Sequence, residues 1–365
     1  MYIKEIIAPL EVLAPASLQE DYDNCGLLTG NTNWQCTGVL IALDATEAVV
    51  NEAKAKGCNL VIAHHPIIFG GLKKITGSNY VERAVITAIK NDIAIYAIHT
   101  NLDNVITGVN GKMADMLGLI NRRPLQPKKG VVKKIVVYVP QAHANKVREA
   151  LFTSGAGTIG NYSGCSFNSS GQGTFTAGKN TQPFVGQADK PHTEEEVKIE
   201  MVYFAWQQQQ LLNALYKAHP YEEVAFDIYA IDNTVDAFGS GLMGELPNAM
   251  PEPDFLDFVK QQFGLQLVRH TALVGKPVTR VAICGGAGSF LTRAAVAAGA
   301  DFYITADVKY HEFFDADKQL VLADIGHYES EQFTINLLFD ILKEKFPTFA
   351  VQKTEVKTNP VHYFL

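Results

Sequence analysis

Short apolar runs alternate with amphipathic helical patterns in two separate stretches of this chain, and this alternation limits the folds it can adopt. In residues 38–99, apolar runs end at Asp44, His65 and His99, and a helical pattern separates each run from the next. Residues 280–326 repeat the same order. Apolar runs joined by single helices indicate βαβ units, because parallel strands need a crossover connection. We therefore predict an α/β fold of two similar halves with mainly parallel strands.

The two stretches also correspond to each other residue by residue. Residues 55–65 (AKGCNLVIAHH) align with 297–307 (AAGADFYITAD), and residues 93–103 (IAIYAIHTNLD) align with 320–330 (LVLADIGHYES). In both halves polar residues collect where a strand stops. Ligands of open α/β sheets bind beyond the carboxyl ends of the strands. We therefore expect the polar residues of the two halves to converge in one crevice.

Between the halves, residues 130–235 have a different pattern, which predicts an inserted domain. Two helical segments separated by strand-like runs give the order βαββαβ, which is typical of a ferredoxin-like α+β fold. The interrupted α/β domain then comprises residues 1–129 and 236–365. The expected strands are 133–140, a run near 158–167, 197–206 and 222–231, the expected helices are 143–155 and 208–219, and 169–192 is expected to be a mobile loop or an irregular hairpin.

Composition excludes several classes of protein. Of the 365 residues 47% are hydrophobic and 19% are charged, which is ordinary for a soluble globular protein. The net charge of −7 argues against a general nucleic-acid binder, because phosphate binding draws on surplus Lys and Arg. The five cysteines form no CxxC pair, which favours a reducing compartment. With no recognisable signal peptide or membrane span, we expect a cytoplasmic protein.

Five residues at the predicted strand ends form a candidate metal site. His64 and His65 are adjacent in an extended segment, where neighbouring side chains point to opposite sides, so the pair can serve two metals. His327 and Glu331 are four residues apart, and on a helix they share one face. With Asp103 this makes five ligands, which is too many for one catalytic zinc but suits two metals bridged by a carboxylate. Mixed imidazole and carboxylate ligands suit Zn first, with Mn, Fe, Co or Ni as alternatives. The competing interpretation is a polar network that ties the strand ends together.

Two further histidines are candidate catalytic residues. His99 and His311 follow predicted strands, and either can orient a ligand, hold substrate or relay protons, since imidazole titrates near neutral pH. The alternative for each is a histidine whose hydrogen bonds are satisfied at the end of a strand or helix. Asp307 has the same two interpretations.

Two other segments have open alternatives. CGGAGS (284–289) precedes a helical pattern, so its N–H groups can either hold a phosphate or form a tight connection. Asp23 and Asn24 are expected to form a turn before Gly26, with lining of the crevice as the alternative. Cys25 beside them is expected to be a small packed side chain.

Several of these segments together resemble the NIF-three-like family, whose bacterial members are named GTP cyclohydrolase I type 2 homologs. The resemblance implies that His64, Asp103 and Glu331 bind one metal, that His65, His327 and Glu331 bind the other, and that Glu331 bridges them. It also implies a ring-shaped homohexamer built as a trimer of dimers. The segments that carry it are DNCGLLTG (23–30), IAHHPIIF (62–69), HTNLDN (99–104), TADVKYHEFFDA (305–316) and GHYESE (326–331).

The inserted region resembles the PII/CutA-like domain of the longer bacterial members, most clearly in AHPYEEVAFDIY (218–229). Shorter relatives lack this domain, so a catalytic requirement for it is not implied.

Two kinds of function follow from these expectations. The first is a dinuclear metal-dependent hydrolase of the GTP cyclohydrolase kind, in which a metal-activated water attacks C8 of a purine nucleotide such as GTP and ring opening releases formate. The second is a non-catalytic metal-binding protein, regulatory or involved in assembly, whose insert senses a small molecule or gates the cavity. The residues support a metal-activated water without selecting GTP, because other C–N or phosphoester bonds suit the same ligands.

Overall fold

The apolar runs of the N-terminal half form a buried, mostly parallel sheet. A computed structural model of the protein describes residues 1–364. The sheet has five strands in the order β1-β4-β3-β2-β15, in which β1 alone is antiparallel to its neighbour. All of β2 is buried except Asp44, and all of β3 except His65, so each buried run ends in a more exposed polar residue. The strands are β1 (Gly26–Thr29), β2 (Val39–Asp44), β3 (Leu60–His65), β4 (Ala94–Ala97) and β15 (Val351–Lys353).

The C-terminal half forms a second sheet with a similar parallel centre. Its order is β11-β14-β13-β12-β10-β5. Strands β12, β13 and β14 are parallel, as β2, β3 and β4 are, whereas β11, β10 and β5 are antiparallel additions. The mixed α/β class and the two similar halves are thus confirmed, and the second sheet is less parallel than the first. Its strands are β5 (Ile120–Pro127), β10 (Gly239–Met250), β11 (Arg269–His270), β12 (Val278–Ala287), β13 (Phe302–Ala306) and β14 (Val321–Asp324).

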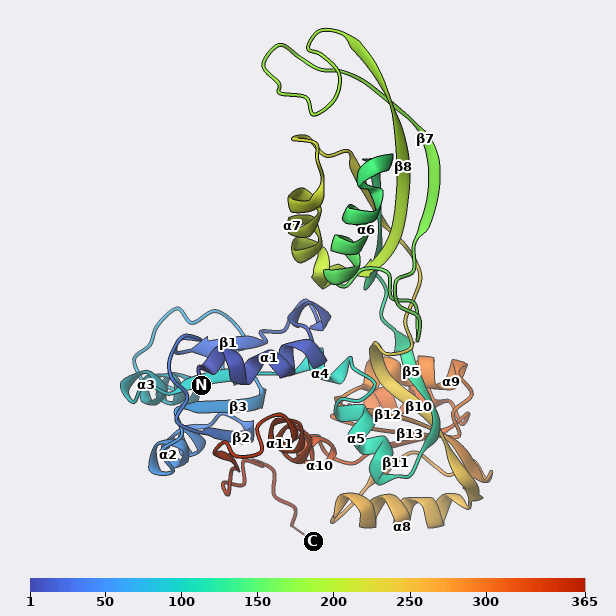
Figure 1. Ribbon diagram of the computed structural model, residues 1–365. Helices are drawn as coiled ribbons and strands as arrows, with labels where there is room; N and C mark the ends of the chain where they lie inside the picture. The colour runs from blue at the N-terminus through green and yellow to red at the C-terminus, as the bar shows by residue number, and fades with distance from the viewer. Residues whose placement is uncertain (365) are drawn as a thin grey trace. The chain divides into compact units, whose positions relative to one another are not determined.

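Helices cover these sheets and connect their strands (Figure 1). Apolar side chains of α2 and α3 pack on the first sheet, and those of α5 and α8 pack on the second. Among residues 1–364, no helix is long and apolar enough to cross a membrane. The α-helices of the two halves are α1 (Ile3–Leu13), α2 (Glu47–Ala55), α3 (Tyr80–Lys90), α4 (Thr100–Asp103), α5 (Val109–Met116), α8 (Glu252–Phe263), α9 (Thr292–Ala297), α10 (His327–Glu331) and α11 (Thr334–Lys345). The 3₁₀ helices are η1 (Ala16–Leu18), η4 (Ser289–Leu291) and η5 (Tyr310–Ala316).

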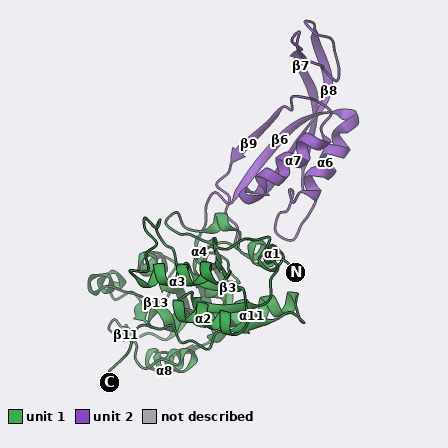
Figure 2. Cartoon of the chain, turned by 90° about the vertical axis from the view of Figure 1, so that its left-hand side faces the viewer, with its two compact units in different colours: residues 1–128, 236–365 green, residues 129–235 purple. Residues whose placement is uncertain are grey.

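The chain divides into two compact units (Figure 2). One unit contains Met1–Lys128 and the chain from Asp236 on, and the other is Lys129–Val235. The second unit has the element order β6-α6-β7-β8-α7-β9, and its antiparallel sheet has the order β7-β8-β6-β9. Both helices bury apolar side chains against β6 and β8, which gives this unit its own core. This is the ferredoxin-like α+β arrangement that the sequence predicts. Its elements are β6 (Val132–Pro140), η2 (Gln141–His143), α6 (Ala144–Thr153), β7 (Phe167–Thr176), β8 (Pro191–Phe204), η3 (Ala205–Gln207), α7 (Gln208–Ala218) and β9 (Phe226–Ala230).

One strand of this unit lies elsewhere than expected. The segment near 158–167 contains only an isolated bridge between Ile159 and Tyr162, and the strand begins at Phe167. Of the two alternatives for 169–192, the hairpin is the correct one, because β7 pairs antiparallel and in continuous register with β8 from Phe167 to Thr176. The alternation of apolar and polar residues does not reveal this strand, since most of its side chains are exposed on both faces.

Candidate metal centre

Strand β3 ends in two histidines that are held in different ways. The side chain of His64 is completely buried, and its Nδ1 atom lies 2.8 Å from the carbonyl oxygen of Ile98. Because a carbonyl oxygen only accepts, Nδ1 carries the proton and donates it, and Nε2 keeps its lone pair. The ring of His65 has its centroid 4.9 Å from that of His64, and its Nδ1 lies 2.8 Å from the Oδ1 of Asp44 at the end of the neighbouring strand β2. Each imidazole is therefore fixed with Nε2 toward the centre.

The matching half of the unit supplies a histidine and a carboxylate from α10. His327 Nδ1 lies 2.7 Å from Asp307 Oδ2, just beyond the end of β13. The Oε2 atom of Glu331 lies 3.1 Å from His327 Nε2 and 2.9 Å from His65 Nε2. The two Nε2 atoms are 3.3 Å apart. Residues from both halves thus meet at Glu331, as the repeat in the sequence predicts.

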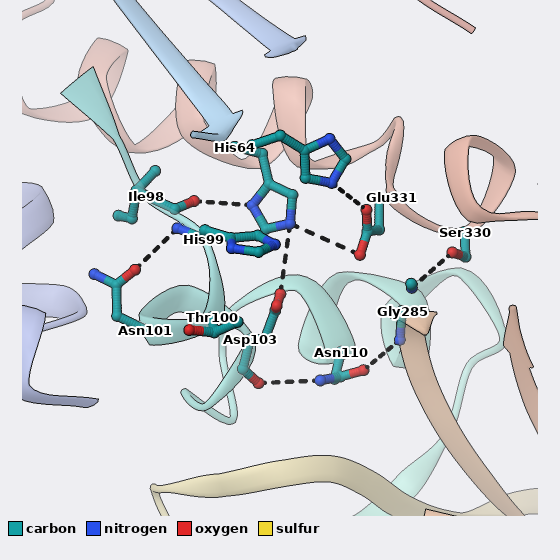
Figure 3. A network of polar contacts seen from close by, with 12 residues as sticks. His64, Ile98, His99, Thr100, Asn101, Asp103, Asn110, Gly285, Ser330 and Glu331 are labelled. Atoms are coloured by element: carbon teal, nitrogen blue, oxygen red, sulfur yellow. Dashed lines mark hydrogen bonds and ion pairs between the residues drawn. The ribbon is translucent and has the colours of Figure 1, made fainter. Parts of the chain in front are cut away.

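Two buried polar atoms at the centre have no hydrogen-bond partner among residues 1–364: Nε2 of His64 and Oδ1 of Asp103. They lie 3.6 Å apart, and Glu331 Oε1 is 3.8 Å from the same Nε2 (Figure 3). Buried polar side-chain atoms nearly always have a partner, because leaving one unsatisfied costs about 1–3 kcal/mol. A cation among these three atoms would satisfy both.

The geometry forms two groups of three that share one residue. In each group the ligand atoms lie within 4.8 Å of one another. The shared residue is Glu331, whose two oxygens face different histidines. The donor set therefore fits the metals that combine imidazole and carboxylate ligands. The groups are His64, Asp103 and Glu331, and His65, His327 and Glu331.

The electrostatics of the centre also favour a bound cation. Burial lowers the pKa of His64 to about 4, so this imidazole is neutral at neutral pH. Burial and the charge of Glu331 raise the pKa of Asp103 well above its ordinary value. Burial also acts to raise the pKa of Glu331, but its contacts with His327, His64 and His65 outweigh burial and hold that pKa low. Two carboxylates this close repel each other unless positive charge lies between them.

The histidines His65 and His327 are held by carboxylates on both sides. Burial lowers the pKa of His65, yet hydrogen bonds to Asp44 and Glu331 raise it to about 10. For His327 the contacts with Glu331 and Asp307 outweigh burial in the same way and raise the pKa to about 9. A metal ion at Nε2 would take the place of the proton that these carboxylates stabilise.

His99 is held by a carboxylate in the same way as His65 and His327 of the centre beside it. Its Nδ1 lies 2.8 Å from Asp23 Oδ1, and its ring packs edge-on against His64 and His65 with centroids 5.2 and 5.4 Å apart. With these two it forms a further group whose ligand atoms lie within 4.8 Å of one another. The structure therefore brings this candidate catalytic residue to the centre, with a carboxylate behind it.

His311, in contrast, is not brought to the centre. It is exposed on η5, where its ring contacts Tyr310 and Phe314, and the described lining of the central cavity does not include it. The backbone adopts a left-handed conformation at Asp307, with φ 54°, and then enters this 3₁₀ helix. The position of His311 after a strand in the sequence was therefore insufficient to predict where its side chain lies. The backbone conformation between the strand and His311 decides this.

The glycine turn at 284–289 positions Glu331 and is not arranged to hold a phosphate. The N–H groups of Gly285, Gly286 and Gly288 donate to side chains of Asn110, Ser330 and Thr305. Gly286 has φ 64°, and a Cβ atom there would lie 2.4 Å from Glu331 Oε1. The tight connection is therefore the correct alternative.

Sequence analysis assigned no supporting role to three residues that hold side chains of the centre in place. Asp44 fixes His65, Asp23 fixes His99, and Asn110 donates to the carbonyl oxygen of Asp103 at 3.0 Å. For Asp44 a signal was present, since it ends a strand as His65 does. Asp23 was expected to form a turn, with lining of the crevice as the alternative, and its partner His99 is 76 residues away in the chain. Hydrogen bonds from His99, Thr100 and Cys25 outweigh burial and lower the pKa of Asp23.

The comparison with protein families gives a match over nearly the whole chain. Residues 1–360 match the model described as Duf34/NIF3 (NGG1p interacting factor 3). A Halalkalibacterium halodurans protein named "GTP cyclohydrolase 1 type 2 homolog" is 39% identical over 360 residues, and the match covers 97% of each chain. A Bacillus subtilis protein of the same name is 38% identical over 327 residues, covering 89% of this chain and 88% of that one.

Solved structures agree with this match. The crystal structure of a Bacillus cereus protein related to NIF3 has a TM-score of 0.84 at 38% identity, covering 100% of this chain and 99% of that one. A Staphylococcus aureus crystal structure has a TM-score of 0.78 at 32% identity with the same coverage. The match over residues 1–360 and the relatives at 38–39% identity show that the chain belongs to the Duf34/NIF3 family.

Proposed function

We propose that this protein is a metal-dependent hydrolase with two divalent ions per chain, with zinc as the first candidate. The observation that carries the proposal is the pair of buried, unpartnered atoms, His64 Nε2 and Asp103 Oδ1, beside a glutamate shared by two ligand groups. His64, Asp103 and Glu331 would hold one ion, and His65, His327 and Glu331 the other. Two ions in such a site would supply Lewis-acid activation of a water.

The surrounding residues prepare the ligands for this role. Ile98, Asp44 and Asp307 each accept the Nδ1 proton of one histidine, which leaves Nε2 to bind and fixes the ring orientation. Asn110 holds the backbone carbonyl of Asp103, so that its carboxylate stays beside His64.

His99 is the residue placed to move a proton. Asp23 accepts its Nδ1 hydrogen at 2.8 Å, so Nε2 can accept a proton in the cavity, and Asp23 then stabilises the charged ring. This arrangement supports the catalytic role expected for His99.

The names of the relatives make a purine nucleotide such as GTP the first substrate to test, and we extend that class to this chain as a proposal. We likewise propose a cytoplasmic homohexamer, a trimer of dimers, as the working assembly. The competing function is a non-catalytic metal-binding protein in which the insert regulates access to the cavity.

Metal analysis combined with a turnover assay separates these functions. Zinc-loaded protein is expected to contain close to two ions per chain, and Glu331→Ala is expected to lose most of both. His311→Ala, a histidine outside the centre, is the matched control and should keep both. Turnover of GTP, other nucleotides or phosphoesters that disappears in Glu331→Ala supports the hydrolase. Retained metal with no turnover on any of them contradicts the hydrolase and favours the non-catalytic protein, and folded protein that takes up no metal contradicts both.

A further inference from the structure

Large aromatic side chains surround the cavity that opens onto the metal centre. The cavity has a volume of about 730 Å³ and lies between the two halves of the first unit. Four aromatic residues that line it are unusually exposed: Tyr22 64%, Phe69 52%, Tyr80 65% and Phe290 65%. Exposed rings that converge on one cavity mark a ligand site more often than scattered single ones do.

These rings come from both halves, and one of them contacts a residue beside the metal centre. The ring of Phe69, just beyond β3, packs edge-on against His99 with centroids 5.6 Å apart. Phe290 belongs to η4, immediately after the glycine turn that holds Glu331. A planar ring that occupies the cavity can therefore stack on aromatic faces while one edge meets the metal centre.

Apart from the histidines of the metal centre, the charged groups in the cavity wall are acidic. Glu20 and Asp44 line it in addition to Asp103 and Glu331, and within the described chain no lysine or arginine is part of that lining. Lys128 lies behind Glu20, and its Nζ is bound to the Glu20 carboxylate at 2.8 Å. Burial and the charges of Glu20, Asp103 and Asp23 raise the pKa of the Tyr22 hydroxyl, as expected where the potential is negative.

Polyphosphate recognition requires the opposite chemistry. Proteins hold phosphate chains with Arg and Lys side chains and with free backbone N–H groups. The N–H groups of the glycine turn already donate to Asn110, Ser330 and Thr305. Positive charge in the described lining is therefore confined to the metal centre, where it comes from the ions or, without them, from His65 and His327.

We propose that the cavity selects a planar, uncharged ring system whose reacting bond lies at the metals. A molecule that fits it carries no anionic group away from the metals. The inference rests on the proposed function and narrows its substrate class. A nucleobase or nucleoside meets the description. A nucleoside triphosphate placed with its base at the metals does not, because the described lining offers its phosphates no lysine or arginine.

Binding measurements with guanosine and GTP test this selection. In zinc-loaded protein, Phe69→Ala and Phe290→Ala are each expected to weaken guanosine binding at least fivefold. Phe314→Ala is the matched control, because this phenylalanine is also exposed, at 66%, but lies outside the cavity lining. After chelation, with the fold checked by circular dichroism, GTP should bind at least tenfold more weakly than guanosine.

Guanosine that fails to bind, or binds equally well to both cavity variants, overturns the inference, and so does GTP that binds the chelated protein as tightly as guanosine. The turnover assay tests the proposed hydrolase independently of these binding measurements. Ring binding without turnover contradicts the hydrolase and leaves this inference standing, whereas GTP turnover by protein that does not bind guanosine contradicts this inference alone.

Discussion

Single residues at the metal centre differ in what they contribute, and not all of the important ones are ligands. Each ligand histidine is oriented by an Nδ1 partner that would bind no metal. The carboxylate of Glu331 fits beside residue 286 only because glycine has no Cβ atom there. Loss of such supporting contacts typically costs 10–100-fold in metal affinity. The centre therefore extends beyond the atoms that would touch the ions.

Replacing Gly286 with alanine should weaken metal binding without removing a ligand. The new Cβ would lie 2.4 Å from Glu331 Oε1 and force that carboxylate away. We expect zinc affinity to fall at least tenfold in a chelator competition assay. Gly264→Ala is the matched control, since Gly264 has nearly the same φ of 66° and no atom within 4 Å of the added Cβ. Equal affinities for wild type and Gly286→Ala would show that Glu331 does not need this glycine.

At the scale of elements, two irregular segments are tied down beside the centre. The loop between β3 and α3, which carries Phe69, is held by Glu82 at the start of α3. The segment after β15 passes the first sheet, where the hydroxyl of Thr358 donates to Asp44 Oδ2. Both depend on a few side-chain hydrogen bonds, so each can be tested by a single substitution.

Stability of the β3–α3 loop should depend on pH through Glu82. Hydrogen bonds from Ser78 and Thr76 lower its pKa from 4.5 to about 2. A lowered folded-state pKa contributes stability that is complete above the unfolded value and is lost as pH falls toward the folded value. Glu82→Gln should therefore be less stable than wild type at pH 7, and the difference should shrink between pH 4.5 and 2 in urea unfolding. Glu344→Gln, at an exposed position of α11, should show no such convergence, and a pH-independent difference for Glu82→Gln would contradict the assignment.

The segment after β15 should tune the metal centre through Asp44. Without the Thr358 hydroxyl, Asp44 holds His65 less firmly, and we expect Thr358→Val to lower zinc affinity severalfold. Thr354→Val is the control, because Thr354 anchors the same segment through Glu52, which lies outside the cavity lining. The effect should vanish in an Asp44→Asn background, measured as a double-mutant cycle. Equal losses in both threonine variants would indicate general loosening of the segment.

For the whole molecule, the candidate metal centre brings together residues of two halves that are far apart in the chain. His65 and Glu331, whose side chains meet at 2.9 Å, are separated by 266 positions. The unit Lys129–Val235, in contrast, has a core of its own. Ions at the centre should therefore stabilise one unit and leave the amide protection of the other unchanged.

Chelation should lower the unfolding temperature of the first unit by about 5–10 °C, because a ligand at 100 times its Kd stabilises by about 2.7 kcal/mol. Hydrogen exchange should become faster at the end of β3 and in α10. Amides of β6 and β8 serve as the internal control and should exchange at their former rates. Uniformly faster exchange in both units would contradict a local role for the metals.

The sequence by itself determined where chemistry could occur: at the ends of apolar runs, where polar side chains follow a buried strand such as β3. Adjacency in a strand was enough to assign His64 and His65 to different ligand groups, and helical spacing was enough to pair His327 with Glu331. Only the tertiary structure decided that Asp44, Asp23 and Asn110 hold this centre, that His311 lies outside it and that β7 continues the insert's sheet. These outcomes depend on contacts between distant segments and on backbone dihedrals after each strand, neither of which local periodicity encodes.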